Sequence, residues 1–207
     1  MWRLVGHDWA VDILARALAA ERLAHAYLFT GEAQIGKRTL ALEFAGALNC
    51  QAEDVPCGEC RACRATAEGN HPDVILIDGQ NKIKIEQIRD LQRQLALSPY
   101  EGKFKVCIIT DLHLASTEAA NALLKTLEEP PSRVVLLLTA ISTEALLPTV
   151  VSRCQVMALR PLASELVINH LVTHEGQTPE RAAEISRWAS GQIGWAIQAA
   201  RDASLVD

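Results

Sequence analysis

The sequence has no apolar run of the roughly 20 residues that a helix needs to span a bilayer. Its N-terminus lacks the basic and then apolar pattern of a secretory signal. It also has no excess of positive charge, because the formal net charge is −5 at pH 7. No overall field would therefore attract nucleic acid, and any contact with DNA would be local or made by a partner. We expect a cytoplasmic protein with no membrane contact.

The composition is that of an ordinary globular protein. The chain has 207 residues, of which 49% are apolar and 22% charged, enough for one large or two small domains. It contains six cysteines, and thiols stay reduced in the cytoplasm. Four of the six lie within residues 50–63, so the sequence favours metal binding over disulfides.

Short apolar runs alternate with helical patterns along the first 160 residues. The expected strands are 26–29, 74–77, 105–110, 134–138 and 155–158. The expected helices are 8–21, 40–48, 85–97 and 117–129. The run 134–138 is apolar throughout, which is typical of a strand inside a parallel sheet that is covered on both faces. The alternation predicts an α/β fold with a parallel sheet flanked by helices.

The pattern changes after Arg160 and Pro161. No strand candidate follows, and helical spacing covers residues 163–174, 178–189 and 192–203. We therefore expect a core domain over residues 1–160 and a small helical domain over residues 161–207.

Residues 31–39 resemble a phosphate-binding loop with one substituted position. The pattern requires Gly, four residues, Gly, Lys, then Ser or Thr, and Gly31, Gly36 and Lys37 fit it. Arg38 replaces the hydroxyl that normally holds Mg²⁺. Thr39 is one residue late, about 100° around a helix, so we expect it to point away from the metal site. The loop predicts ATP or ADP binding without hydrolysis; the alternative is a tight turn that binds nothing.

The third expected strand ends at an acidic residue. Asp111 is suitably placed to help hold Mg²⁺, but Leu112 follows it where a water-activating Glu is usual. Arg38 and Leu112 thus affect the same reaction. Taken alone, Asp111 also fits the role of a helix or turn cap.

Four cysteines form the clearest candidate metal site. Cys57, Cys60 and Cys63 follow one another at three-residue spacing, and Cys50 at the end of the preceding helix can complete a tetrahedron. We expect one structural Zn²⁺, with a redox pair as the competing interpretation. Cys107 and Cys154 are expected to be packing residues.

Residues 118–131, EAANALLKTLEEPP, and residues 152–154, SRC, carry a family resemblance. They closely resemble the bacterial DNA polymerase III clamp loader subunits of the AAA+ class, and the resemblance covers nearly the whole chain. It implies an AAA+ core with a zinc module at residues 50–63 and a three-helix lid. It also implies a C-terminal collar domain that is absent from these residues.

Within that family the chain resembles the delta-prime type more than the gamma/tau type. Gamma/tau subunits are ATPases with an intact loop and an Asp-Glu strand end, whereas delta-prime subunits have degraded ATPase parts and an intact Ser-Arg-Cys. Arg38 and Leu112 match the delta-prime type. Active members carry a lid arginine in a Gly-Ser-x-Arg-like stretch, and here Gly194 stands in that place.

The resemblance also implies roles and partners. Arg153 would act in trans as an arginine finger in the ATP site of an adjacent gamma/tau subunit, although its spacing alone favours an ordinary surface arginine. Thr139 matches a phosphate-sensing position. The implied partners are gamma/tau and delta subunits, with the sliding clamp and primed DNA reached through the DNA polymerase III complex. The rivals are an active gamma/tau-type ATPase and a zinc-dependent module of another AAA+ pathway.

Overall fold

A computed structural model describes residues 2–79 and 82–205. Its centre is a five-stranded sheet of order β2-β3-β4-β1-β5, in which every recorded strand pair is parallel. The strands are β1 Ala26–Thr30, β2 Val74–Ile77, β3 Lys105–Ile109, β4 Val134–Ala140 and β5 Gln155–Ala158. The strands lie where the apolar runs predict them, and the predicted α/β class is confirmed.

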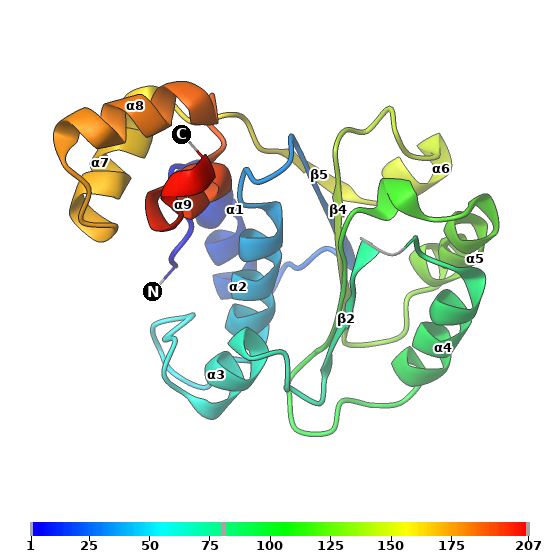
Figure 1. Ribbon diagram of the computed structural model, residues 1–207. Coiled ribbons are helices and arrows are strands. Elements are labelled where there is room, and N and C mark those ends of the chain that lie inside the picture. Colours follow the sequence, from blue (N-terminus) through cyan, green and yellow to red (C-terminus); the bar gives the residue numbers. More distant parts are fainter. Residues whose placement is uncertain (1, 80–81, 206–207) are drawn as a thin grey trace.

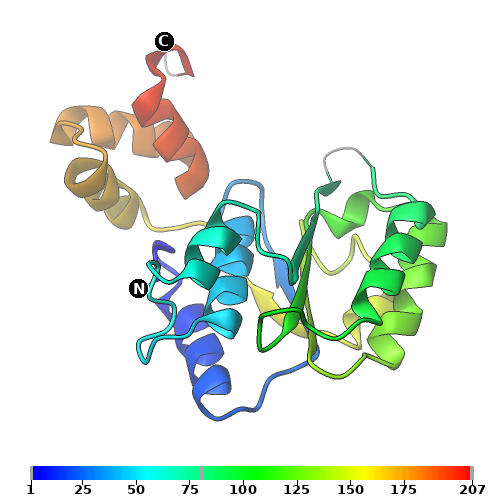
Figure 2. The same cartoon turned by 90° about the horizontal axis from the view of Figure 1, so that it is seen from below.

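Helices cover both faces of this sheet (Figure 1). They are α1 Asp8–Ala19, α2 Lys37–Asn49, α3 Arg61–Ala67, α4 Ile85–Leu95, α5 Thr117–Glu128 and α6 Pro148–Val151. A 3-10 turn, η2 Leu112–Leu114, follows β3. Helices α1, α2 and α3 lie on one side of the sheet, and α4, α5 and α6 lie on the other, as Figure 2 also shows.

Alternation along the strands builds the two cores. Tyr27 and Phe29 of β1 pack with Leu40 and Phe44 of α2. Leu28, one residue out of phase, belongs to the cluster on the other face. Successive strand side chains point to opposite faces, so each inner strand supplies both cores. This is why β4, at the centre, is buried over its whole length.

Helices α7 Ser164–His174, α8 Pro179–Ala189 and α9 Ile193–Arg201 follow the sheet, and a 3-10 turn, η3 Ala203–Leu205, comes after them. Their buried faces form a separate apolar cluster that includes Val167, Leu171 and Ile185. The change of core falls between Leu159, which packs with the sheet, and Leu162, which packs with these helices.

Helix α3 is not among the helices that the sequence predicts, and it contains Cys63. Cys60 caps the helix, and its Sγ accepts a hydrogen bond from the N–H of Cys63. The run Arg61–Ala67 consists largely of alanine and arginine, both strong helix formers.

No helix in residues 2–79 or 82–205 combines the length and apolar character of a bilayer-spanning segment.

Candidate nucleotide cleft and metal centre

The phosphate loop connects β1 to α2 as its pattern predicts. Gly36 immediately precedes α2 with φ 107°, and Gly31 has φ 143°, which are conformations that L side chains rarely adopt. A Cβ on Gly31 would lie 2.6 Å from the Leu159 carbonyl oxygen. The glycines therefore hold a compact loop against the start of a helix, where backbone N–H groups favour an anion.

Lys37 is buried at the start of α2, with only 8% of its surface exposed. Its Nζ donates to the carbonyl oxygens of Gly31 at 2.7 Å and Glu32 at 2.6 Å. Burial lowers the pKa of the Lys37 ammonium, while the carboxylates of Asp111 and Glu32 act in the opposite direction. The geometry places a cation over the loop, as phosphate binding requires.

The loop opens onto a cleft of about 510 Å³. The ends of β2, β3 and β4 meet there because parallel strands share one carboxyl edge. The polar lining combines three cations with hydroxyls and carboxylates, from Arg3, Lys37, Arg38, Thr39, Asp78, Thr110, Asp111 and Thr139. Thr39, expected to point away, also lines the cleft. Sequence reasoning missed Arg3 and Asp78, although Asp78 follows a strand end just as Asp111 does.

Asp111 lies at the cleft edge in a left-handed conformation, with φ 48°. Its N–H donates to Thr139 Oγ1 at 2.9 Å, so the ends of β3 and β4 are joined. Asp111 occupies the N-cap of η2, but its side chain makes no capping hydrogen bond. Leu112 is 2% exposed and belongs to the core beneath the sheet. A buried leucine cannot activate water.

Three polar contacts join α9 and its flanking turn to the phosphate loop. The N–H of Gly194 donates to the Gln34 carbonyl oxygen at 2.7 Å. Gln192 Nε2 donates to Glu32 Oε2 at 3.2 Å, and Gln34 Nε2 donates to Gln198 Oε1 at 3.3 Å. A Cβ on Gly194 would lie 2.8 Å from the Gln34 oxygen, so this close contact requires glycine. Gly194 thus meets the phosphate loop through its backbone.

Replacing Gly194 with alanine is expected to lower the free energy of unfolding by about 1–3 kcal/mol, because the methyl group would force α9 away from the loop. Gly46→Ala is the matched control: it lies inside α2, and the new Cβ would be 4.0 Å from the nearest atom. That change should raise stability by roughly 0.5–1 kcal/mol. Urea unfolding of both variants measures the difference, and equal stabilities would contradict the close contact.

Arg153 is not among the residues that line this cleft. It follows α6, and its Nη2 lies 2.7 Å from Glu128 Oε1 at the end of α5. Its Nη1 also donates to the Thr149 carbonyl oxygen at 2.8 Å. The side chain is 34% exposed. Nη1 also lies 3.3 Å from Ser152 Oγ, so three partners position the guanidinium at the surface.

The four predicted cysteine ligands come together. The Sγ atoms of Cys50, Cys57, Cys60 and Cys63 all lie within 4.8 Å of one another. Three sulfur–sulfur distances are 3.6 Å (Cys50–Cys57), 3.9 Å (Cys50–Cys60) and 4.0 Å (Cys57–Cys63). Four thiolates at a Zn–S distance of about 2.3 Å around a tetrahedral ion would be about 3.8 Å apart. The donor set and its spacing fit a structural metal.

The other two cysteines lie apart from this cluster. Cys107 is fully buried in β3. The Cys154 Sγ donates to the Val150 carbonyl oxygen at 3.2 Å. Burial raises the pKa of the Cys154 thiol to about 12, so this thiol is not a reactive thiolate at neutral pH.

Solved structures share this fold. A DNA polymerase III gamma subunit-related protein from Thermotoga maritima is 26% identical and matches with a TM-score of 0.60, covering 86% of this chain and 57% of its own. A RuvB variant from the same organism has a TM-score of 0.67 over 95% of this chain and 62% of its own. At 15% identity, the RuvB likeness shows the fold alone. The AAA+-like architecture is thereby confirmed.

Sequence relatives are more informative. The family described as "DNA polymerase III, delta subunit" matches residues 6–163. The DNA polymerase III subunit delta' of Pseudomonas aeruginosa is 43% identical over 153 residues, covering 72% of this chain and 47% of the relative. The subunit tau/gamma of Haemophilus influenzae is 41% identical over 170 residues, covering 81% of this chain and 25% of the relative.

This chain thus spans between a quarter and about half of the length of these two curated relatives. The family match includes the phosphate loop, the cysteine cluster and Arg153. Together with the fold, this shows that the chain belongs to the clamp loader subunit family of DNA polymerase III, which includes the delta' and tau/gamma subunits.

Proposed function

We propose that this chain is a non-hydrolysing clamp loader subunit of the delta-prime type. It would help to load the sliding clamp onto primed DNA as part of the cytoplasmic DNA polymerase III holoenzyme. The observation that carries the proposal is Leu112, which is buried in the core directly after Asp111. Arg38 supplies no hydroxyl for Mg²⁺, and Gly194 supplies no lid cation, so three parts of a hydrolytic site are missing.

The catalytic contribution of this chain would go to a neighbouring subunit. Arg153 is partly exposed and is held by Glu128 and Thr149. A guanidinium delivered to a partner's ATP would stabilise negative charge on the transferring phosphate. We assign this role in trans to Arg153, with a gamma/tau subunit as the recipient and a delta subunit as a further partner.

The chain would also carry one structural Zn²⁺, bound by Cys50, Cys57, Cys60 and Cys63. Four protein ligands leave no open position, so the metal would stabilise the fold and take no part in catalysis. We place residues 1–160 in the AAA+ core and residues 161–207 in the lid. The division follows the change of apolar cluster between Leu159 and Leu162.

An active gamma/tau-type ATPase is the second candidate. Lys37, Asp111 and Thr139 all lie at the cleft, and the Haemophilus tau/gamma relative is 41% identical. ATP or ADP binding in the cleft is compatible with both candidates. Hydrolysis separates them, because it needs metal coordination and water activation in addition to a phosphate cradle.

The purified protein is expected to bind ADP or ATP with an affinity that changes little on adding Mg²⁺, because Arg38 replaces the metal-holding hydroxyl. Lys37→Ala should abolish that binding by removing the charge above the loop. Calorimetric titration with and without Mg²⁺ measures both effects. Steady-state turnover by the purified protein that disappears in Lys37→Ala would instead establish the ATPase candidate.

Assembly tests the family role against a module of another AAA+ pathway. The full-length protein, mixed with tau/gamma and delta subunits, should elute with them as one complex in size-exclusion chromatography. Failure to co-elute at micromolar concentration would contradict the clamp loader role, whatever the outcome of the nucleotide titration.

A further inference from the structure

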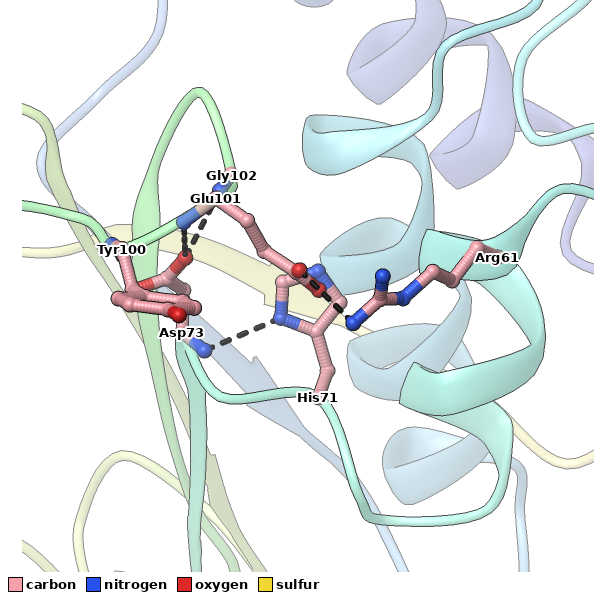
Figure 3. A network of polar contacts seen from close by, with 6 residues as sticks. All are labelled: Arg61, His71, Asp73, Tyr100, Glu101 and Gly102. Carbon is pink, nitrogen blue, oxygen red and sulfur yellow. Dashed lines mark hydrogen bonds and ion pairs between the residues drawn. The ribbon is translucent and has the colours of Figure 1, made fainter.

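The loop between α4 and β3 is held by a buried carboxylate (Figure 3). Asp73 is 0% exposed and accepts three backbone N–H bonds, from Tyr100 at 2.6 Å and from Glu101 and Gly102 at 2.8 Å each. Burial would raise the pKa of the Asp73 carboxyl, but these three bonds outweigh it and leave the pKa below its usual value. Asp73 therefore remains charged and fixes the tip of the loop.

A second tie begins beside a metal ligand. Asn49, the last residue of α2, directly precedes Cys50. Its Oδ1 accepts from the Phe104 N–H at 2.9 Å, and its Nδ2 donates to the Phe104 carbonyl oxygen at 3.0 Å. A Cβ on Gly102 would lie 2.7 Å from Asn49 Oδ1, so the loop approaches this amide as closely as glycine allows.

A third tie begins beside another ligand. Arg61, the first residue of α3, directly follows Cys60. Its Nη2 lies 3.0 Å from Glu101 Oε2, and Figure 3 shows the side chain extending from α3 toward the loop. Beyond α3, His71 Nδ1 accepts from the Asp73 N–H at 3.1 Å. The chain that continues from the cysteine cluster through α3 thus reaches Asp73, the residue that holds the tip of the loop.

We propose that the four-cysteine metal centre is a brace that positions the loop between α4 and β3, residues 96–104; this rests on the proposed metal binding. Cys50 lies at the end of α2, and the other three cysteines lie in the following segment. A shared ion would join the end of α2 to the segment that begins α3. The first contacts the loop through Asn49 and Phe104, and the second through Arg61 and Glu101. Metal occupancy would therefore control the loop, including Tyr100, which is 84% exposed.

Amide hydrogen exchange of the zinc-loaded full-length protein, before and after a chelator strips the metal, tests the brace. We expect the amides of Tyr100, Glu101, Gly102 and Phe104 to exchange at least about tenfold faster without metal. Amides of β4 should stay protected because they lie at the centre of the sheet. Metal content measured on the same samples keeps the two proposals apart. A protein that never holds zinc refutes the metal site, whereas zinc loss with unchanged loop exchange refutes the brace.

If removing the metal unfolds the whole protein, a variant that keeps the metal ligands tests the brace instead. Asn49→Ala removes both bonds to Phe104 and keeps every cysteine. By linkage, a change that frees the loop must also weaken the metal site. We expect the zinc-loaded variant to show faster loop exchange and at least about tenfold weaker zinc affinity in equilibrium competition with a chelator. Asn121→Ala, at an exposed position on α5, is the control. An unaltered zinc affinity in Asn49→Ala would overturn the brace.

Discussion

Replacing Arg153 with alanine is expected to lower ATP hydrolysis at the adjoining tau/gamma site by about a thousandfold in the reconstituted complex. The guanidinium would stabilise charge that develops on the transferring phosphate, an effect that no uncharged side chain supplies. Arg153→Lys should restore little of the rate, because an ammonium cannot present two parallel N–H donors. Single-turnover hydrolysis of radiolabelled ATP measures the site directly.

Arg22→Ala is the matched control for this experiment. Arg22 is an exposed arginine in the connection after α1, so its loss changes the net charge equally. Both variants should assemble with the partner subunits as the parent does. Hydrolysis that is unchanged by Arg153→Ala in a fully assembled complex would leave the Glu128 contact as an ordinary surface ion pair, worth little to stability.

Loss of the metal is expected to have the largest effect on stability. The protein should contain one zinc per chain, and Cys60→Ser should release it. At a free zinc concentration a thousandfold above Kd, bound metal stabilises the folded state by about 4 kcal/mol, and the variant should lose that amount. Elemental analysis and urea unfolding at fixed free zinc measure the two effects.

Cys154→Ser is the control for the metal ligands, because Cys154 lies outside the four-sulfur cluster. Its zinc content should equal that of the parent protein. A folded parent without metal, or a Cys60→Ser variant that keeps one zinc per chain, would contradict the four-thiolate site.

The sheet and the clustering of the four cysteines were predictable because their signals are local. The unbroken apolar run of β4 indicates its central position in the sheet, and the cysteine spacing indicates that the four Sγ atoms lie close together. The phosphate loop was predictable for the same reason, since Gly31, Gly36 and Lys37 lie within a few residues of each other. These features depend on neighbours in the chain.

Tertiary contacts were not predictable in the same way. Nothing near Gly194 in the sequence indicates that its N–H bonds to Gln34, 160 positions earlier. In the sequence, Asp73 resembles an ordinary turn carboxylate. Only the structure shows that the N–H groups of residues 100–102 donate to it. Arg3 enters the cleft because the N-terminal segment is held by the Glu43 carboxylate, which accepts from the Arg3 N–H at 2.8 Å. Such contacts depend on how distant elements pack.

In the proposed function, Arg153 contributes to ATP hydrolysis in a neighbouring subunit, while the phosphate loop of this chain hydrolyses no ATP. The most direct test compares Lys37→Ala with Arg153→Ala for ATP hydrolysis in one reconstituted clamp loader. We predict that Lys37→Ala leaves turnover unchanged and that Arg153→Ala removes turnover at the adjoining site. The reverse pattern, in which Lys37→Ala reduces turnover and Arg153→Ala does not, would contradict this account.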